Sequence, residues 1–422
     1  MNLGEAHPQR LLIVTQYFWP ESFIVNDLVR ILAQQGHEVV VATGKPNYPE
    51  GRIYDGYQCL GVQSERYTDN VEVFRVPLWP RGEGGSRNLV LNYISFVFSG
   101  LVFFPWLLRK RDFDFILVFA PSPITQVIPA LLLKWLKKSH LAVWIQDLWP
   151  ESLAATGFVK HKYLLKTIGR LVKRIYAGCD TLLVQSRSFI EPVARYARRE
   201  KIIYYPNSID VSTPDEVVNG VPLELTELLD QHFSVVFAGN LGAAQAVETL
   251  LETAILLKHY PEIRLVLVGG GSRVEWLHSQ KQVHQLDNLI LPGRFSMAVM
   301  PQIFDHSDVL LVSLKDEEIF AKTIPSKIQA YLAAGRPIIA SLRGEGARIV
   351  TESGAGTACD PEDPSALAAL ICSMKNLPAA ELQKMGQAGK AYFYEHFEMS
   401  NQVMRLVEIL KTQRKERQSC AY

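Results

Sequence analysis

Short apolar runs alternate with segments of helical length along almost the whole chain, and this alternation constrains the fold more than any other feature. Most runs are five to eight residues long, as in Leu11–Phe18 and Phe115–Ala120, and stretches such as Ile124–Lys138 separate them. Strands that are apolar on both faces and are joined through helices form parallel sheets. The sequence therefore predicts the α/β class.

The alternation runs in two series. The first series predicts strands at Leu11–Phe18, Glu38–Thr43, Val71–Arg75, Phe115–Ala120, Leu141–Gln146, Thr181–Gln185 and Ile202–Tyr205. The pattern stops at Pro206, and a polar segment to about Gln231 is expected to be a linker. The second series predicts strands at Phe233–Gly239, Ile263–Gly269, Asn288–Leu291, Asp308–Ser313 and Arg336–Ser341. Since 422 residues exceed what one core serves, we predict two doubly wound, Rossmann-like domains that face each other across a cleft.

Composition excludes several classes of protein. The net charge of +1 argues against a nucleic-acid partner. The five cysteines are scattered and form no CxxC pair, so we expect neither a disulfide framework nor a zinc cluster. None of the ten histidines has the spacing of metal ligands, and the N-terminal MNLGEAHPQR lacks the apolar core of a signal peptide. We expect a cytoplasmic protein without a cofactor or metal.

The whole-chain charge conceals a difference between the halves. Residues 1–210 hold 25 Lys and Arg against 18 Asp and Glu, whereas residues 211–422 hold 19 against 25. One interpretation is chance together with mutual attraction of the two domains. The other is that the first half faces an anionic surface, such as that of a phospholipid bilayer.

The run Asn88–Leu108 is long and apolar enough to span a membrane. Because predicted strands of one sheet precede and follow it, a membrane-spanning segment would place them on opposite sides of the bilayer. Two other interpretations stay open: a buried helix, and a helix lying in the membrane interface with Trp106 and Arg109–Arg111 at the headgroups. In the last case residues 88–111 make a peripheral contact with the inner leaflet.

The loops after the strands narrow the choice of ligand. The first strand is followed by no GxGxxG, and no Walker pattern is present. Instead Gly239–Gly242 ends the first strand of the second half and leads into a helix near Gln245, and Gly269–Ser272 repeats this arrangement. Pro325 then opens a helix whose start carries Ser326 and Lys327. Glycine turns and helix N-termini bind anions, although tight turns without a ligand explain the glycines as well.

Several of these segments resemble a known family. GNLG (239–242), LVLVGGGS (265–272) and IPSKIQAYLAAGRPIIAS (324–341) are similar to the retaining glycosyltransferases of family 4. Within that family, NYPEGRIYDGY (47–57) and WIQDLWPESLAATG (144–157) resemble bacterial transferases of O-antigen and exopolysaccharide synthesis, of the colanic-acid fucosyl- or N-acetylfucosaminyltransferase type.

The resemblance implies a fold and a reaction. The fold is GT-B, with an acceptor-binding domain at 1–208, a nucleotide-sugar domain at 209–390 and a C-terminal helical segment at 391–422 that packs on the first domain. The reaction is metal-independent transfer of a sugar, with retention, from a nucleotide donor that we expect to be UDP-linked. The expected acceptor is a saccharide on a polyprenyl diphosphate. A nucleotide-sugar 2-epimerase of similar fold and a non-catalytic nucleotide-sugar-binding subunit remain alternatives.

The resemblance also implies site residues. The family's two glutamates fall on Lys322 and Ala330, and its basic residue after the glycine turn falls on Gln245, so Glu345 is our substitute for the second glutamate. The expected catalytic residues are Asp147 and Lys322. The expected donor-side residues are Gly239, Asn240, Gly242, Gln245, Gly271, Arg294, Ser326, Lys327 and Glu345. The expected acceptor-side residues are Glu21, Ser22, Asn26 and Glu151.

Overall fold

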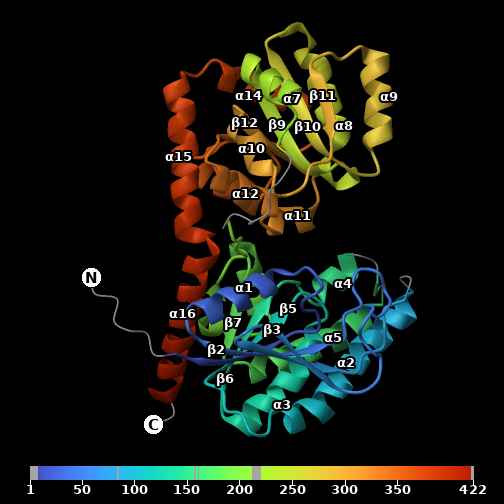
Figure 1. Cartoon of the computed structure of the whole chain (residues 1–422), viewed down its shortest axis with the longest axis vertical. Helices are drawn as coiled ribbons and strands as arrows, with labels where there is room; N and C mark the ends of the chain where they lie inside the picture. Colours follow the sequence, from blue (N-terminus) through green and yellow to red (C-terminus); the bar gives the residue numbers. More distant parts are fainter. Residues whose placement is uncertain (1–7, 83–84, 156–157, 160, 212–219, 420–422) are drawn as a thin grey trace. The chain divides into compact units, whose positions relative to one another are not determined.

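The computed structural model describes residues 8–82, 85–155, 158–159, 161–211 and 220–419 and divides into two compact units. Unit 1 comprises Met1–Asn207 together with Met399–Tyr422, and unit 2 comprises Ser208–Glu398. Each unit contains one sheet covered by helices (Figure 1). The helix α15 (Ala379–His396) runs without a break through residue 390, so unit 2 extends to Glu398.

Unit 1 is built on an eight-stranded sheet of order β3-β4-β2-β1-β5-β6-β7-β8. Its strands are β1 (Arg10–Val14), β2 (Glu38–Gly44), β3 (Gln63–Thr68), β4 (Val71–Val76), β5 (Phe115–Ala120), β6 (His140–Ile145), β7 (Thr181–Val184) and β8 (Ile202–Tyr204). All predicted strands of the first half are present. The edge strand β3 was not predicted, because its sequence QSERYT is polar, and it pairs antiparallel with β4.

Alternate residues of the central strand β1 face two separate cores. Leu12 and Val14 pack with the helices α2 (Ser86–Leu107), α3 (Val127–Lys137) and α5 (Lys162–Gly178). Leu11 and Ile13 pack on the other face with α1 (Ile24–Gln34) and α16 (Met399–Ser419). The short helices of this unit are α4 (Glu151–Ala155), α6 (Ile190–Ala194) and the 3₁₀ turns Ile124–Gln126, Arg187–Phe189 and Arg199–Lys201.

The apolar run at 88–108 forms α2, which packs against the sheet of unit 1. Asn92, Phe96 and Phe104 point into the unit and are fully buried. Within the described residues, Arg87–Leu107 is the one helix long and apolar enough to cross a membrane, and 28% of its most apolar 18-residue window is buried inside the structure. The helix therefore contributes to the core along one side and leaves most of its surface outside it.

Unit 2 is built on a six-stranded parallel sheet of order β11-β10-β9-β12-β13-β14. Its strands are β9 (Phe233–Asn240), β10 (Ile263–Gly270), β11 (Leu289–Gly293), β12 (Val309–Ser313), β13 (Ile338–Ser341) and β14 (Gly356–Cys359). Its helices, besides α15 and the 3₁₀ turns Ala243–Gln245 and Leu257–His259, are α7 (Leu223–Gln231), α8 (Val247–Leu256), α9 (Val274–His284), α10 (Met300–Asp305), α11 (Glu318–Lys322), α12 (Ser326–Ala334), α13 (Glu345–Glu352) and α14 (Pro364–Lys375).

The end of the expected linker is a helix. Residues 223–231 form α7, whose Leu225 and Leu229 lie in the core of unit 2, so the prediction of a loose segment up to Gln231 was wrong. The leucines are four residues apart and share one face of the helix, which outweighs the polar composition of the segment. Residues 212–219 of the expected linker lie outside the described residues.

The connections place a switch point in each sheet. The chain leaves β1 for β2 on one side and returns to β5 on the other, and β9 likewise lies between β10 and β12. At such a point the loops leave the sheet in opposite directions and open a crevice beyond the carboxyl ends of the strands. Ligands of parallel α/β sheets bind in this crevice.

The last helix returns to unit 1, as predicted. Val403, Leu406 and Leu410 of α16 are fully buried against the face of the sheet that also carries α1. The hydroxyl of Tyr205 donates to the carbonyl of Gln402 at 3.1 Å, and Arg414 forms an ion pair with Asp114 at 3.3 Å. The core on this face of the unit 1 sheet is therefore complete only when α16 has packed on it.

We expect Leu406→Ala to lower the free energy of unfolding of unit 1 by about 2–5 kcal/mol, because it opens a cavity in a close-packed core. The matched control is Met404→Ala, on the same helix but with a side chain that is 49% exposed, which should change it by less than about 0.5 kcal/mol. Urea unfolding followed by tryptophan fluorescence measures both. Equal effects of the two substitutions would contradict the packing of α16 on this sheet.

Candidate functional site

A glycine turn ends the central strand of unit 2 at its switch point. Gly239 has φ +135°, a conformation that side chains other than glycine rarely adopt. A Cβ atom there would lie 2.7 Å from Cε of Lys327. The missing side chain thus makes room for Lys327, which reaches from the first turn of α12 across the end of β9. The structure brings these two predicted residues together.

The amine of Lys327 is buried without a counter-charge. Within the described residues its Nζ has no hydrogen-bond partner, and it lies 3.6 Å from the centre of the Phe237 ring. Burial disfavours the ammonium form and lowers the pKa of Lys327 from 10.5 to about 7. A buried amine at the start of a helix, where the backbone N–H groups are also unpaired, is arranged to receive an anion.

The other predicted donor-side residues of the first two loops lie around the same turn. The side-chain oxygen of Gln245 accepts from the backbone N–H of Gly242 at 3.3 Å and from Asn240 Nδ2 at 3.4 Å. A Cβ atom at Gly271 would lie 2.7 Å from Oδ1 of Asn240. Gln245 occupies the sequence position at which the resembled family carries a basic residue. Here its side chain instead links the residues of the glycine turn by hydrogen bonds.

Arg294, Ser326 and Glu345 flank this loop in different ways. Arg294 is exposed, and its side chain lies against the backbone of Gly270 at the end of β10. Ser326 is the exposed first residue of α12. Glu345 is buried at the start of α13 and forms an ion pair with Arg348 at 2.8 Å. A Cβ atom at Gly346 would lie 3.2 Å from Pro325, so the starts of α12 and α13 are adjacent.

Lys322 is engaged in an ion pair of its own. It is the last residue of α11, and its amine pairs with the exposed carboxylate of Glu318 one turn earlier. Its predicted catalytic role requires that this pair opens, since the Glu318 carboxylate already neutralises the amine. Among the described residues of this region, Lys327 differs from Lys322 in that its amine is buried and has no carboxylate beside it.

Asp147 lies at the carboxyl edge of the sheet in unit 1. It follows β6, and its Oδ2 accepts from the indole N–H of Trp149 at 3.1 Å. The same indole N–H lies 3.3 Å from the hydroxyl of Ser122, which follows β5. Burial raises the pKa of Asp147, although hydrogen bonds to its carboxylate oppose the shift. The carboxylate therefore stands at the edge where a parallel sheet binds its ligand.

Two of the four predicted acceptor-side residues, Glu21 and Asn26, join neighbouring loops by hydrogen bonds. The carboxylate of Glu21 accepts from the backbone N–H groups of Asn47 at 2.8 Å, Tyr48 at 2.7 Å and Phe18 at 3.1 Å. Burial nevertheless raises the pKa of Glu21 to about 7. Asn26 donates to the carbonyl of Glu21 at 2.7 Å. The joined loops after β1 and β2 form the rim of the crevice.

The two remaining acceptor-side residues are more accessible. Ser22 is exposed in the turn between β1 and α1. Glu151 begins α4 and forms a long ion pair with Arg195 at 3.8 Å. Its partners differ from those of Asp147, so the structure does not make the two carboxylates a pair.

A buried polar cluster at the same edge was not predicted. Gln16 donates from Nε2 to Asn92 Oδ1 at 2.6 Å, and Arg81 donates from Nη1 to the hydroxyl of Tyr17 at 2.9 Å. The guanidinium of Arg81 also lies 5.1 Å from the centre of the Tyr48 ring. The one available signal was the asparagine that interrupts the apolar run of α2. These residues bring a cation and several amide groups to the carboxyl ends of β1 and β2.

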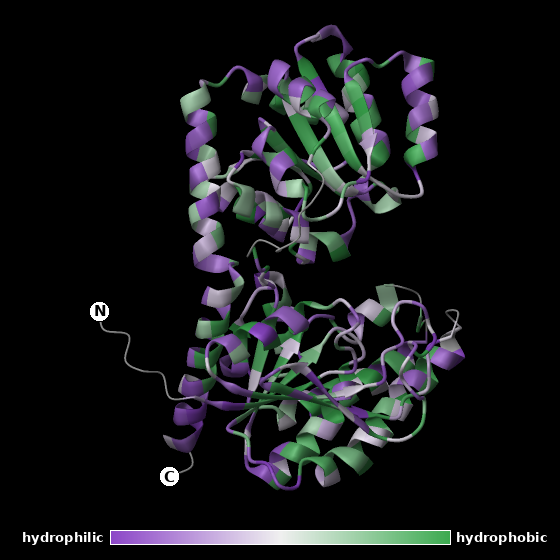
Figure 2. Ribbon diagram, in the orientation of Figure 1, coloured by the Kyte–Doolittle hydropathy of each residue, from purple (hydrophilic) through white to green (hydrophobic). Residues whose placement is uncertain are grey.

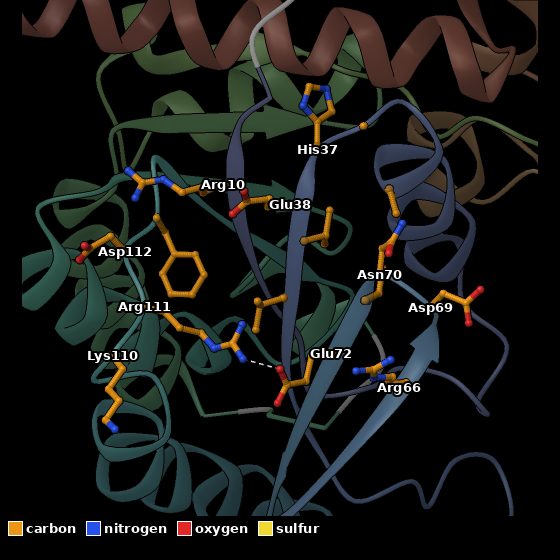
Figure 3. Close-up of a pocket in the computed structure, with 16 residues that line it drawn as sticks. Arg10, His37, Glu38, Arg66, Asp69, Asn70, Glu72, Lys110, Arg111 and Asp112 are labelled. Carbon is orange, nitrogen blue, oxygen red and sulfur yellow. Dashed lines mark hydrogen bonds and ion pairs between the residues drawn. The ribbon is translucent and has the colours of Figure 1, made fainter.

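A cavity of about 680 Å³ lies at the opposite edge of the same sheet. Figure 3 shows charged side chains of both signs around it, with an ion pair between Arg111 and Glu72. Arg10 and Glu38, the first residues of β1 and β2, also line it. Because it lies at the amino ends of the strands and its cations are matched by acids, we do not assign it a role in the chemistry.

The buried amine predicts a pH-dependent stability. The pKa of Lys327 is about 7 in the folded chain and 10.5 as its ordinary value, so the cost of burying the ammonium is complete below pH 7 and declines toward pH 10.5. We expect Lys327→Met to raise the melting temperature of unit 2 by several degrees at pH 6, and by less at pH 9. Calorimetry measures this, with Lys384→Met, an exposed lysine of α15, as control. A gain that does not depend on pH would contradict an uncompensated amine.

Comparison with known families divides the chain as the structure does. Residues 23–208 match the model of the glycosyl transferase 4-like domain, and residues 232–376 match that of glycosyl transferases group 1. The first match covers the sheet of unit 1 from β2 to β8 and begins after β1, and the second covers the whole sheet of unit 2.

Two curated proteins are similar over most of their length. WcaI of Escherichia coli (strain K12), assigned as a colanic acid biosynthesis glycosyl transferase, is 25% identical over 84% of this chain and 88% of its own. WbjE of Pseudomonas aeruginosa, assigned as a glycosyltransferase, is 26% identical over 74% of this chain and 77% of its own.

Solved structures share the fold at low sequence identity. HepE of Anabaena, solved with UDP, has a TM-score of 0.64 at 13% identity and covers 96% of this chain and all of its own. The UDP-forming α,α-trehalose-phosphate synthase of Burkholderia vietnamiensis has a TM-score of 0.66 at 15% identity and covers 96% of this chain and 97% of its own. The chain is therefore a protein of the GT-B fold, built from a glycosyl transferase 4-like domain followed by a domain of glycosyl transferases group 1.

Proposed function

We propose that this protein is a retaining glycosyltransferase that moves a sugar from a UDP-linked donor to a saccharide on a polyprenyl diphosphate. The observation that carries the proposal is the buried amine of Lys327, without a partner in the described structure, beside the glycine turn of β9. It lies in the unit that matches glycosyl transferases group 1. A diphosphate leaving group needs a cation and N–H donors at the point where its charge develops.

The choice of a UDP-linked donor rests on structural neighbours. HepE was solved with UDP and with UDP-glucose, and the trehalose-phosphate synthase is named as UDP-forming. These proteins share the fold with this chain at 13–15% identity, so they support the class of donor and leave the sugar open. Retention is supported in the same way, because trehalose-6-phosphate synthase is studied for glycosyl transfer with retention.

The proposed chemistry uses the chain's own charges. The bond between the sugar's anomeric carbon and the β-phosphate oxygen breaks and a bond to an acceptor oxygen forms. The acceptor's hydroxyl proton passes to an oxygen of the departing diphosphate and from there to solvent. Negative charge therefore grows on the diphosphate, where protonated Lys327 and the first N–H groups of α12 stabilise it. Binding must raise the pKa of Lys327 from about 7, so the amine takes up a proton as the donor enters. The proposal assigns no step to a metal ion.

The acceptor side of the proposal rests on the carboxyl edge of unit 1. Asp147 presents a carboxylate there with a raised pKa, and Arg81 presents a guanidinium beside Tyr17. We assign Asp147 to hold the acceptor hydroxyl or the transferred sugar, and Arg81 to the anionic part of the acceptor. Arg81 was absent from the sequence-based set.

The biological setting follows from the curated relatives. WcaI is assigned to colanic acid biosynthesis, and its similarity covers most of both chains. We therefore place the proposed reaction in the assembly of a bacterial surface polysaccharide, at the inner face of the cytoplasmic membrane. A carrier lipid keeps the growing saccharide at that surface, which explains a need for contact with the bilayer through residues 88–111.

UDP binding should consume a proton above pH 7. Lys327 is mostly neutral in the free chain at pH 8 and charged in the complex, so we expect an uptake approaching one proton at pH 8 and almost none at pH 6. Calorimetric titration with UDP in two buffers of different ionisation enthalpy measures the uptake. GDP, dTDP and CDP, titrated in the same way, identify the base.

Two matched lysine variants test whether UDP binding and proton uptake depend on Lys327 in particular. Lys327→Met should weaken UDP binding by about tenfold to a hundredfold and abolish the proton uptake, and Lys384→Met should change neither. Tight UDP binding without uptake would remove Lys327 from the site. No binding of any nucleoside diphosphate by the folded chain would overturn the proposed donor class.

Asp147→Asn should lower kcat at least about a hundredfold and leave UDP affinity unchanged, because Asp147 and the donor loop belong to different units. Activity of the native chain should fall as the pH drops through the raised pKa of Asp147, since the ionised carboxylate is required. The assay follows transfer of labelled sugar to a polyprenyl-diphosphate monosaccharide, with the new linkage examined by NMR.

The exposed Asp112→Asn in the same unit is the control for charge. Undiminished transfer by Asp147→Asn would end its catalytic assignment, and an inverted anomeric centre would overturn retention. An epimerised nucleotide-sugar formed without any acceptor would favour the 2-epimerase instead.

A further inference from the structure

Three helices of unit 1 form one layer that contains no carboxylate. α2, α3 and α5 include no Asp or Glu in their sequences, whereas they carry Arg87, Lys134, Lys137, Lys162, Lys166, Arg170, Lys173 and Arg174. The helices on the other face of the same sheet are mixed, with Asp27 in α1 and Glu408 and Glu416 in α16. The excess of positive charge in the first half is therefore concentrated on one side of the unit.

The three helices are packed into a continuous layer. A Cβ atom at Gly100 of α2 would lie 2.7 Å from Pro129 of α3. A Cβ atom at Gly178 of α5 would lie 2.6 Å from Leu131 of α3. All three helices also share the core beneath them. Their outer sides therefore form one surface, which we call the helical layer surface.

An apolar stripe runs along α2 on that surface. Val90, Ile94, Phe98, Val102 and Trp106 recur every four residues, which places them on one side of the helix. They are 42–68% exposed, with Phe98 the most exposed. Figure 2 shows the apolar character of α2 and α3. A stripe of this length left in water is costly, and its exposure indicates a partner.

The other two helices extend the stripe with aromatic and basic residues. Trp135 of α3 is 76% exposed, and Tyr163 of α5 is 79% exposed. The guanidinium of Arg109, just after α2, lies 4.9 Å from the centre of the Trp106 ring. Tryptophan and tyrosine beside cations are characteristic of protein segments that lie at the level of lipid headgroups.

The packing of α2 is inconsistent with a membrane span. Asn92 and Ser99 are buried within unit 1, and Asn92 Nδ2 donates to the carbonyl of Trp79 at 2.6 Å. Phe96 and Phe104 are in the core on the same side. Withdrawing the helix into a bilayer would break these hydrogen bonds and uncover the sheet. The helix must lie along the surface with its outer stripe toward the partner.

A second copy of the chain fits this surface poorly. A twofold interface brings the same patch of both copies together. The cations of the layer would then face one another with no acid of the layer to neutralise them. The acids next along the chain are Asp112, which is exposed, Asp114 and Asp180. Asp114 already pairs with Arg10 and Arg414, and Asp180 with Lys134 of α3 and Arg417, so neither is free to neutralise the exposed cations of α5.

We infer that the helical layer surface, made of α2, α3 and α5 together, docks flat on an anionic phospholipid bilayer. The stripe of α2, with Trp135 and Tyr163, enters the headgroup region, and the exposed cations of α5 lie at the lipid phosphates. This extends the contact beyond residues 88–111 to residues 127–137 and 162–178. The inference rests on the proposed function only in that a lipid-linked acceptor would lie at the same bilayer. The evidence for docking is the composition and exposure of the helical layer surface.

The test is flotation of the full chain with vesicles of stated composition. Vesicles of phosphatidylcholine with about 30% phosphatidylglycerol are compared with phosphatidylcholine alone, at about 0.1 M salt. We expect the chain to float with the anionic vesicles, to be released at about 1 M salt and to float weakly with the neutral ones.

Two variants test the two parts of the surface. Phe98→Ser with Trp106→Ser removes apolar contact with the headgroup region and should reduce flotation with the anionic vesicles. Its control is Leu223→Ser, which changes a 71% exposed leucine of unit 2 and should leave flotation unchanged. Lys166→Gln, Arg170→Gln and Lys173→Gln together should lower the partition coefficient by about a hundredfold, near fivefold for each cation. Their control is Lys258→Gln, Lys384→Gln and Lys390→Gln in unit 2, which should have no effect.

Several outcomes would overturn the inference. Absence of flotation by a folded chain that still binds UDP would do so without affecting the proposed donor site. Flotation that neither surface variant reduces, or that is equal on neutral vesicles, would remove this surface as the anionic docking face. A native dimer that Phe98→Ser with Trp106→Ser converts to a monomer would assign the stripe to a second copy. Resistance to alkaline extraction from cell membranes would indicate a span.

Discussion

Burial of both faces of each sheet is the constraint on which the rest of the structure depends. The central strands β1 and β9 are apolar along their length, so helices must cover them on both sides. With both faces covered and the strands parallel, the carboxyl edge becomes the place where loops with polar groups gather. Asp147, Arg81, Lys327 and the glycine turn all lie at such an edge, whereas the cavity beside Arg111 lies at the other.

Lys327 is a buried cation that no acid among the described residues neutralises. An ammonium group placed against an aromatic ring without a carboxylate is unfavourable for the folded state. Glu318 neutralises Lys322, and Glu345 pairs with Arg348, so the neighbouring charges are satisfied within the chain. Under the proposed function, the donor diphosphate supplies the negative charge that the described part of the chain does not place beside this amine.

The sequence was informative where a signal is local and uninformative where it depends on distant partners. Apolar runs located every central strand, but QSERYT of β3 is too polar and Gly356–Cys359 too short to stand out. The glycine turn and the lysine of α12 were predicted as separate motifs. That the missing Cβ of Gly239 makes room for Lys327 depends on packing between β9 and α12. The hydrogen bond between Gln16 and Asn92 joins residues 76 positions apart, and the asparagine within the apolar run of α2 was its one trace in the sequence.

The return of α16 to unit 1 makes unit 2 an insertion within it. During synthesis the ribosome completes β1 to β8 about 190 residues before α16 begins, so the face that Leu406 and Leu410 later cover stays open while unit 2 is being made. Unit 2 is continuous in the chain and can fold as soon as it emerges. The second unit can thus be complete before the first, and until α16 packs, the part of this sheet face that α1 does not cover stays exposed to solvent.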